Sequence, residues 1–120
     1  MPLTNLIDEY KSLAEVCAKI DYSDKKSIRN NNKAVGRMYK IVEKIRDDFG
    51  VEGLSQFQEL LDVPTYKTNL WVAIQMLEKT TVSREVENKA LKIIEEEAKG
   101  ETTNALGTSI WLKDYKKKEK

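Results

Sequence analysis

Apolar side chains recur at spacings of three and four residues along this chain, and this pattern predicts helices. In residues 3–20 the recurring positions form one stripe of an amphipathic helix: Leu6, Tyr10, Leu13, Cys17 and Ile20. Two prolines and five glycines interrupt the chain, and no useful length alternates strictly between apolar and polar residues. We therefore expect an all-α fold without a sheet.

The breakers and caps divide the chain into about six helices. They are expected near residues 3–20, 24–49, 53–61, 66–79, 83–99 and 102–115. Thr4 or Asn5 is expected to cap the first helix, Ser23 or Asp24 the second and Ser83 the fifth. Gly50, Pro64 and Gly100 are the expected stops.

Three features of the predicted helices have their own interpretation: an asparagine run, the apolar residues of the last helix and the single cysteine. Three successive asparagines, residues 30–32, either form a weak solvated part of the second helix or mark a break or a polar surface. In the last helix we expect Leu106 and Ile110 to be buried. Cys17 lies on the apolar stripe of the first helix and is expected to be a buried small side chain.

Length and composition predict one folded domain over residues 1–120. Apolar residues make up 40% of the chain and charged residues 34%, which is too apolar for a disordered chain and too polar for a membrane protein. No apolar run approaches the roughly 20 residues of a membrane span, and Met1 to Leu6 lacks the pattern of a signal peptide. We expect a cytoplasmic protein that does not bind a membrane.

The missing residue types argue against catalysis. The chain has no histidine and one cysteine, which removes Ser-His and Cys-His nucleophilic mechanisms, the commonest zinc ligand and an intramolecular disulfide. The acidic run at residues 95–97 cannot converge on one ion, since consecutive helical residues point in different directions. We predict no catalytic residues, no metal site and no cofactor.

The charge balance gives little support to nucleic-acid binding. Lys plus Arg number 21 and Asp plus Glu number 20, whereas nucleic-acid binders usually carry a basic excess. The best evidence for that alternative is a basic stripe on the second helix: Arg29, Lys33, Arg37, Lys40 and Lys44. We interpret the stripe as a solvated helix face. The basic tail is interpreted as a solvated end: Lys116, Lys117, Lys118 and Lys120.

The second half of the chain carries a weak internal echo of a two-helix unit, residues 57–79 and 90–114. Three stretches around it are NLWVAIQMLEK (69–79), KIIEEEAKG (92–100) and ALGTSIWLKDYKK (105–117). With them the last two thirds of the chain resemble a bacterial family of small proteins known as domain of unknown function twenty-nineteen. The resemblance implies a short α-α superhelix similar to HEAT or armadillo repeats. In that family the proline lies closer to the tryptophan than Pro64 lies to Trp71 here.

Trp71 and Trp111 are the side chains of most interest. Tryptophan packs between helices or anchors a binding surface, and stacked helix pairs present extended concave surfaces. We predict a partner-binding surface formed by four residues: Tyr66, Asn69, Trp71 and Gln75.

The predicted function is therefore a non-catalytic protein-binding module, and within that class a bacterial toxin-immunity-type protein, by analogy of fold. The alternatives are a small-ligand protein with a pocket between helices and a helical nucleic-acid-binding protein.

Overall fold

A computed structural model describes residues 2–100 and 103–118, in which every regular element is helical. The elements are α1 (Leu3–Ala18), α2 (Lys25–Phe57), the 3₁₀ turns η1 (Gln58–Asp62) and η2 (Thr65–Lys67), α3 (Thr68–Lys79), α4 (Arg84–Ala98) and α5 (Thr103–Lys118). The prediction of an all-α fold is confirmed, and the five α-helices of the described residues are close to the expected six.

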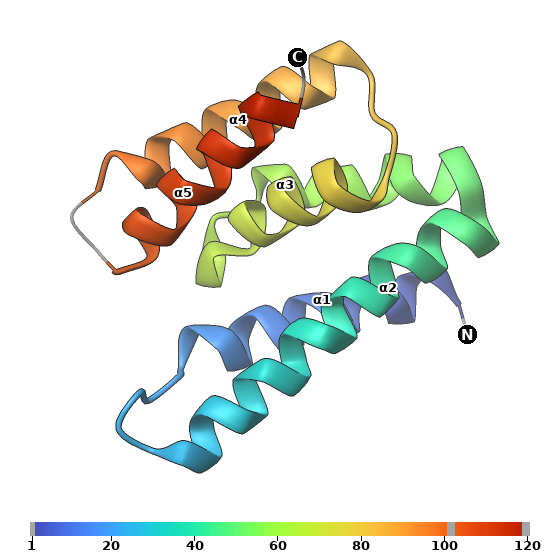
Figure 1. The fold of residues 1–120 in the computed structure, drawn as a ribbon. Helices are drawn as coiled ribbons and strands as arrows, with labels where there is room; N and C mark the ends of the chain where they lie inside the picture. Colours follow the sequence, from blue (N-terminus) through green and yellow to red (C-terminus); the bar gives the residue numbers. More distant parts are fainter. Residues whose placement is uncertain (1, 101–102, 119–120) are drawn as a thin grey trace.

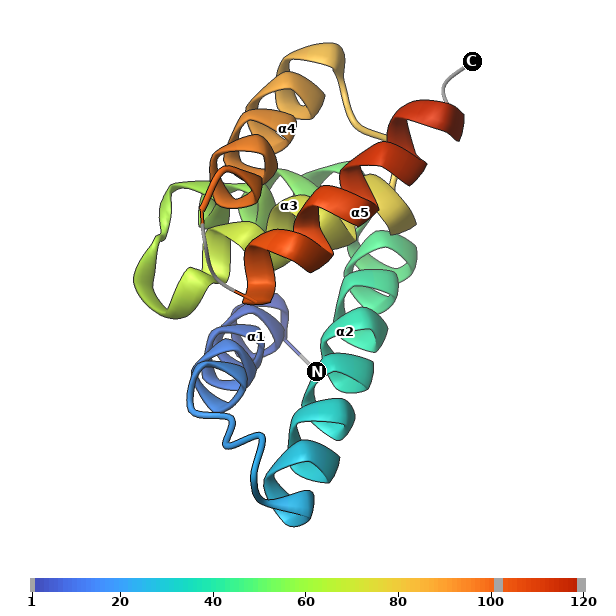
Figure 2. The same cartoon turned by 60° about the vertical axis from the view of Figure 1, so that its left-hand side comes forward.

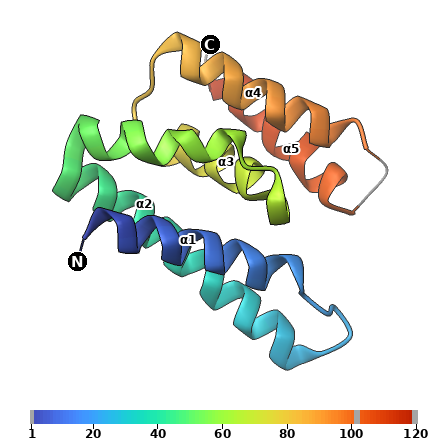
Figure 3. The same ribbon diagram turned by 180° about the vertical axis from the view of Figure 1, so that it is seen from behind.

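The helices form antiparallel pairs that stack on one another (Figure 1). α1 lies against the first part of α2, residues 51–62 lie against α3, and α4 lies against α5. The views in Figures 2 and 3 show two layers, one with α2, α3 and α5 and the other with α1, residues 51–62 and α4. α3 lies in the middle of the stack, so both neighbouring pairs contact it.

Gly50 produces the turn between the first two pairs. Its φ of 60° and ψ of −143° are not helical, although hydrogen bonding continues through it from Lys25 to Phe57. Residues with a Cβ strongly avoid this backbone conformation. Three residues later Gly53 is buried, and a Cβ there would collide with Phe49. The sequence predicts a helix stop at Gly50. The chain does reverse its direction there, but the hydrogen bonds continue across the turn, so α2 extends to Phe57.

Most predicted helix ends agree with the structure, and among the predicted caps the one for the first helix is wrong. Asp24 accepts a hydrogen bond from the backbone of Lys26, and Ser83 accepts one from Val86, as their capping roles require. At the start of α1 the cap position is Pro2, which makes no side-chain bond, so Thr4 and Asn5 lie inside the helix. The asparagines at residues 30–32 continue α2 without a break. The expected first residue of the last helix, Thr102, lies outside the described residues.

A buried hydrogen bond lies at the centre of the core. The Tyr10 hydroxyl of α1 donates to Oε1 of Gln75 on α3 at 2.8 Å, and both side chains are fully buried. The Tyr10 ring meets the Phe57 ring edge-on, with centroids 4.8 Å apart. Burial raises the pKa of Tyr10 well above its ordinary value, so the hydroxyl remains a donor. The contact joins α1, the end of α2 and α3.

Two burial predictions can be tested. Cys17 is buried, as expected, and burial raises the pKa of its thiol. Ile110 is 55% exposed, so the prediction that it is buried is wrong. The reason is the rotation of α5, which turns Thr108 inward and Trp111 and Leu112 partly inward. The side chain of Leu106 lies outside the described residues.

The buried hydrogen bond leads to a stability prediction. Tyr10→Phe leaves the Gln75 amide without a partner among the described residues, because its Nε2 atom already has none. We expect a loss of about 1–3 kcal/mol in the free energy of unfolding, measured with urea. The double variant Tyr10→Phe/Gln75→Leu should lose less than the sum of the single variants, because it leaves no buried polar group unpaired. Tyr22→Phe, at an exposed position, is the control; an equal loss in this control would contradict the role of the bond.

The backbone at Gly50 leads to a second prediction. Gly50→Ala forces a Cβ into a disfavoured conformation and should cost about 1–3 kcal/mol in the free energy of unfolding. Gly36→Ala is the matched control. It lies exposed inside α2 with open space around the new Cβ, and should stabilise the protein by up to ~1 kcal/mol. Chemical denaturation measures the stability of both variants. A change in the same direction in both would contradict the requirement for glycine at position 50.

Candidate partner-binding groove

A groove lies between α3 and α5. We call it the two-tryptophan groove, and its volume is about 270 Å³. Its lining consists of Lys67, Leu70, Trp71, Ile74, Gly107, Thr108 and Trp111. The tryptophans come from different helices, and both are partly buried against the core. Such half-buried aromatic side chains offer apolar area whose position is already fixed, which favours binding.

Trp111 is held in place by polar and aromatic contacts. Its indole Nε1–H donates to Oε1 of Glu78 at 2.5 Å. Its ring stacks on that of Tyr115, one turn later in α5, with centroids 5.1 Å apart and planes 9° apart. The Tyr115 hydroxyl donates to Glu87 of α4 at 2.8 Å. Trp111 is therefore oriented by three helices.

Glu78 connects the outer surfaces of α2, α3 and α5. Besides the indole of Trp111, its carboxylate accepts a hydrogen bond at 2.7 Å from the hydroxyl of Tyr39 on α2. Partial burial first, and then the bond to Glu78, raise the pKa of Tyr39 above its ordinary value. Tyr39 therefore stays protonated and donates to a charged acceptor, which makes a comparatively strong bond.

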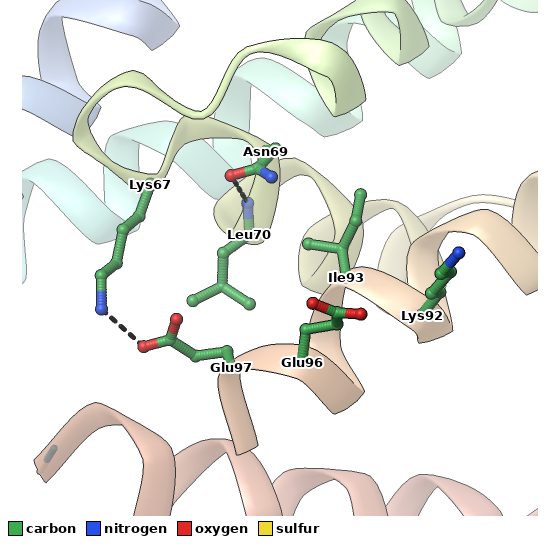
Figure 4. A pocket seen from close by; sticks show the side chains of 7 residues that line it. All are labelled: Lys67, Asn69, Leu70, Lys92, Ile93, Glu96 and Glu97. Carbon is green, nitrogen blue, oxygen red and sulfur yellow. Dashed lines mark hydrogen bonds and ion pairs between the residues drawn. The ribbon is translucent and has the colours of Figure 1, made fainter. Parts of the chain in front are cut away.

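A second, charged hollow of about 430 Å³ lies next to the groove (Figure 4). It is lined by Lys67, Asn69, Leu70, Lys92, Ile93, Glu96 and Glu97. The Lys67 ammonium forms an ion pair of 2.5 Å with Glu97, whereas Lys92 points away from this pair. Lys67 and Leu70 line both spaces. The hollow is where the small-ligand alternative would place its ligand.

The four predicted surface residues do not form one surface. Trp71 lines the two-tryptophan groove, and Asn69 lines the charged hollow, where its side chain accepts from the backbone of Leu70 at 2.9 Å. Tyr66 is 43% exposed and lines neither space. Gln75 is buried and bound to Tyr10, so its expected place on the surface is wrong. The polarity of Gln75 predicts an exposed side chain, whereas Tyr10 supplies it with a hydrogen-bond partner inside the core.

The sequence interpretation missed Lys67, Glu78 and Tyr115. The spacing of Trp111 and Tyr115, four residues apart, carried a signal, because such residues stack on one face of a helix. No local pattern in the sequence points to Lys67 or Glu78, because these contacts are with residues about 30 positions away.

The charged runs behave largely as solvated faces. In the basic stripe Arg37 makes two hydrogen bonds to Glu9, at 2.6 and 2.9 Å, and hydrogen bonding by Arg37 is the main cause that lowers the pKa of Glu9. The other four residues of the stripe are exposed. In the acidic run Glu97 pairs with Lys67 and Glu95 with Lys116, so the run points in different directions, as expected.

Within residues 2–100 and 103–118, no three acidic, cysteine or histidine side chains gather in a way that would hold a metal ion. In the same residues, no helix has both the length and the apolar character to cross a membrane. Comparisons with protein-family models, with curated proteins and with solved structures give no match. The resemblance to domain of unknown function twenty-nineteen therefore stays a prediction.

The bridging role of Glu78 can be measured by NMR. Glu78→Gln removes the charged acceptor of the Trp111 indole, so its N–H resonance should move upfield and exchange faster with solvent. The Trp71 indole provides the internal reference. Because Glu78 is exposed, the free energy of unfolding should fall by less than about 1 kcal/mol. Glu43→Gln, on α2, should leave the Trp111 resonance in place; a resonance that moves equally in both variants would contradict the contact.

Proposed function

We propose that this chain is a non-catalytic module that binds another protein through the two-tryptophan groove. One observation carries the proposal: two tryptophans from different helices line one open groove together with Leu70 and Ile74. Tryptophan is enriched at the few positions that dominate binding energy in protein interfaces. Fixed orientation of Trp111 supports the same conclusion, because less conformational entropy is lost on binding.

The arrangement of the helices supports this class of function. Stacked antiparallel helix pairs resemble HEAT-like or armadillo-like repeats, which use one layer of helices as an extended binding surface. Here the layer with α2, α3 and α5 would serve, since it carries Tyr39, Glu78, Trp71 and Trp111. We further propose a cytoplasmic protein of the bacterial toxin-immunity type, an assignment supported by analogy of fold alone.

The proposal predicts that Trp71→Ala weakens binding. The wild-type chain would first be used to isolate a partner, and the affinity of the purified pair would then be measured by calorimetry. We expect a loss of about 30-fold or more, which corresponds to the roughly 2 kcal/mol that defines an anchor residue. Circular dichroism would confirm that the variant retains its helices.

Tyr22→Ala is the matched control, because Tyr22 is an aromatic residue that is 66% exposed on the turn between α1 and α2. It should leave the affinity unchanged. If Trp71→Ala folds and binds like the wild type, the groove is not the docking surface.

A further inference from the structure

The two-tryptophan groove has a basic end. Lys67 is the one ionisable residue in its described lining, and the remaining lining is apolar except for Thr108. Lys67 directly precedes α3, whose first-turn N–H groups give that end of the helix a partial positive charge. An occupant that brings a negative charge to this end is therefore complementary to the groove.

The Lys67 ammonium can accommodate a second carboxylate. The ammonium donates one hydrogen bond to Glu97, at 2.5 Å, and an ammonium has three N–H donors. The Lys67 side chain is 44% exposed, so an incoming group can reach it. Glu97 lines the neighbouring hollow and not the groove, so it does not place a negative charge in the lining.

The backbone holds Lys67 in this place at a cost. Tyr66 and Lys67 have φ values of 56° and 57°, in the left-handed region that costs roughly 1–2 kcal/mol for a residue with a Cβ. Hydrogen bonds across the turn stabilise it: Lys67 N–H donates to the carbonyl of Pro64 and Asn69 N–H to that of Val63. Residues in such conformations concentrate at functional sites, which directs attention to what this turn presents.

Groove size limits the occupant. Pockets for small molecules and cofactors span about 300–1,000 Å³, and the groove, at about 270 Å³, is open and lies below that range. Side chains of a polypeptide fit such a space better than a cofactor does.

We propose that the groove holds an apolar side chain of a partner segment, and that Lys67 binds the carboxylate of an acidic side chain adjacent to it in that segment. This inference rests on the proposed function and specifies its partner: an acidic–apolar segment of a protein. The apolar side chain packs between Trp71 and Trp111, and the carboxylate shares the ammonium with Glu97.

Intrinsic fluorescence offers a direct test, because Trp71 and Trp111 are the two tryptophans of the chain. The probes are two blocked peptides of the same shape, acetyl-Leu-Glu-Leu-amide and acetyl-Leu-Gln-Leu-amide. We expect the Glu peptide to bind roughly three- to fivefold more tightly, as for a partly exposed ion pair. The preference should decrease as salt concentration rises.

Two variants test the part of Lys67. Lys67→Met should abolish the preference, so that the Glu and Gln peptides bind this variant with equal affinity. Glu97→Gln removes the competing carboxylate and should increase the preference. Lys92→Met, which alters the neighbouring hollow but not the groove, is the matched control and should retain the preference.

Three results would overturn the inference: equal binding of the two peptides, a preference that survives Lys67→Met, or no fluorescence response to either peptide. None of them bears on the proposed function, which the Trp71→Ala measurement with the purified partner decides. Conversely, a preference that depends on Lys67, together with unchanged partner binding in Trp71→Ala, would support the peptide site. It would also show that this site is not the surface that docks the partner.

Discussion

The buried hydrogen bond between Tyr10 and Gln75 is the contact on which the rest of the structure depends. It fixes α3 against α1, and the Tyr10 ring also fixes the end of α2 through Phe57. A fully buried amide requires partners with suitable geometry, so the bond selects one rotation of α3 where apolar packing alone would tolerate several. The Nε2 atom of Gln75 has no hydrogen-bond partner among the described residues, which makes the bond at Oε1 more important still.

The rotation of α3 in turn determines the surface of the protein. Neighbouring residues on a helix point about 100° apart, so a Gln75 that faces α1 leaves Ile74 facing α5. Trp71, one turn earlier, then lines the groove with Ile74, and α5 completes it with Trp111. Glu78 couples this arrangement to α2 by accepting from Trp111 and Tyr39. Core and groove are thus two consequences of one helix orientation.

The helices themselves were largely predictable. Apolar spacing, the caps at Asp24 and Ser83 and the breakers at Gly50 and Pro64 are local signals, and local signals define helix ends. Trp71 lines the two-tryptophan groove, and its role in binding stays a prediction; the surface position of Gln75, which its polarity alone predicts, is wrong. The same limit explains Ile110, whose apolar character predicts burial although the rotation of α5 exposes it.

By itself the sequence determined that this protein is helical and where most of its helices begin and end. These properties follow from backbone geometry and side-chain hydrophobicity within a few turns. Only the tertiary structure decided that Gln75 turns inward, that Lys67 lies at one end of a tryptophan-lined groove, and that Glu78 joins two aromatic side chains. Each of these contacts links helices distant in sequence, and the relative rotation of packed helices is set by the core as a whole.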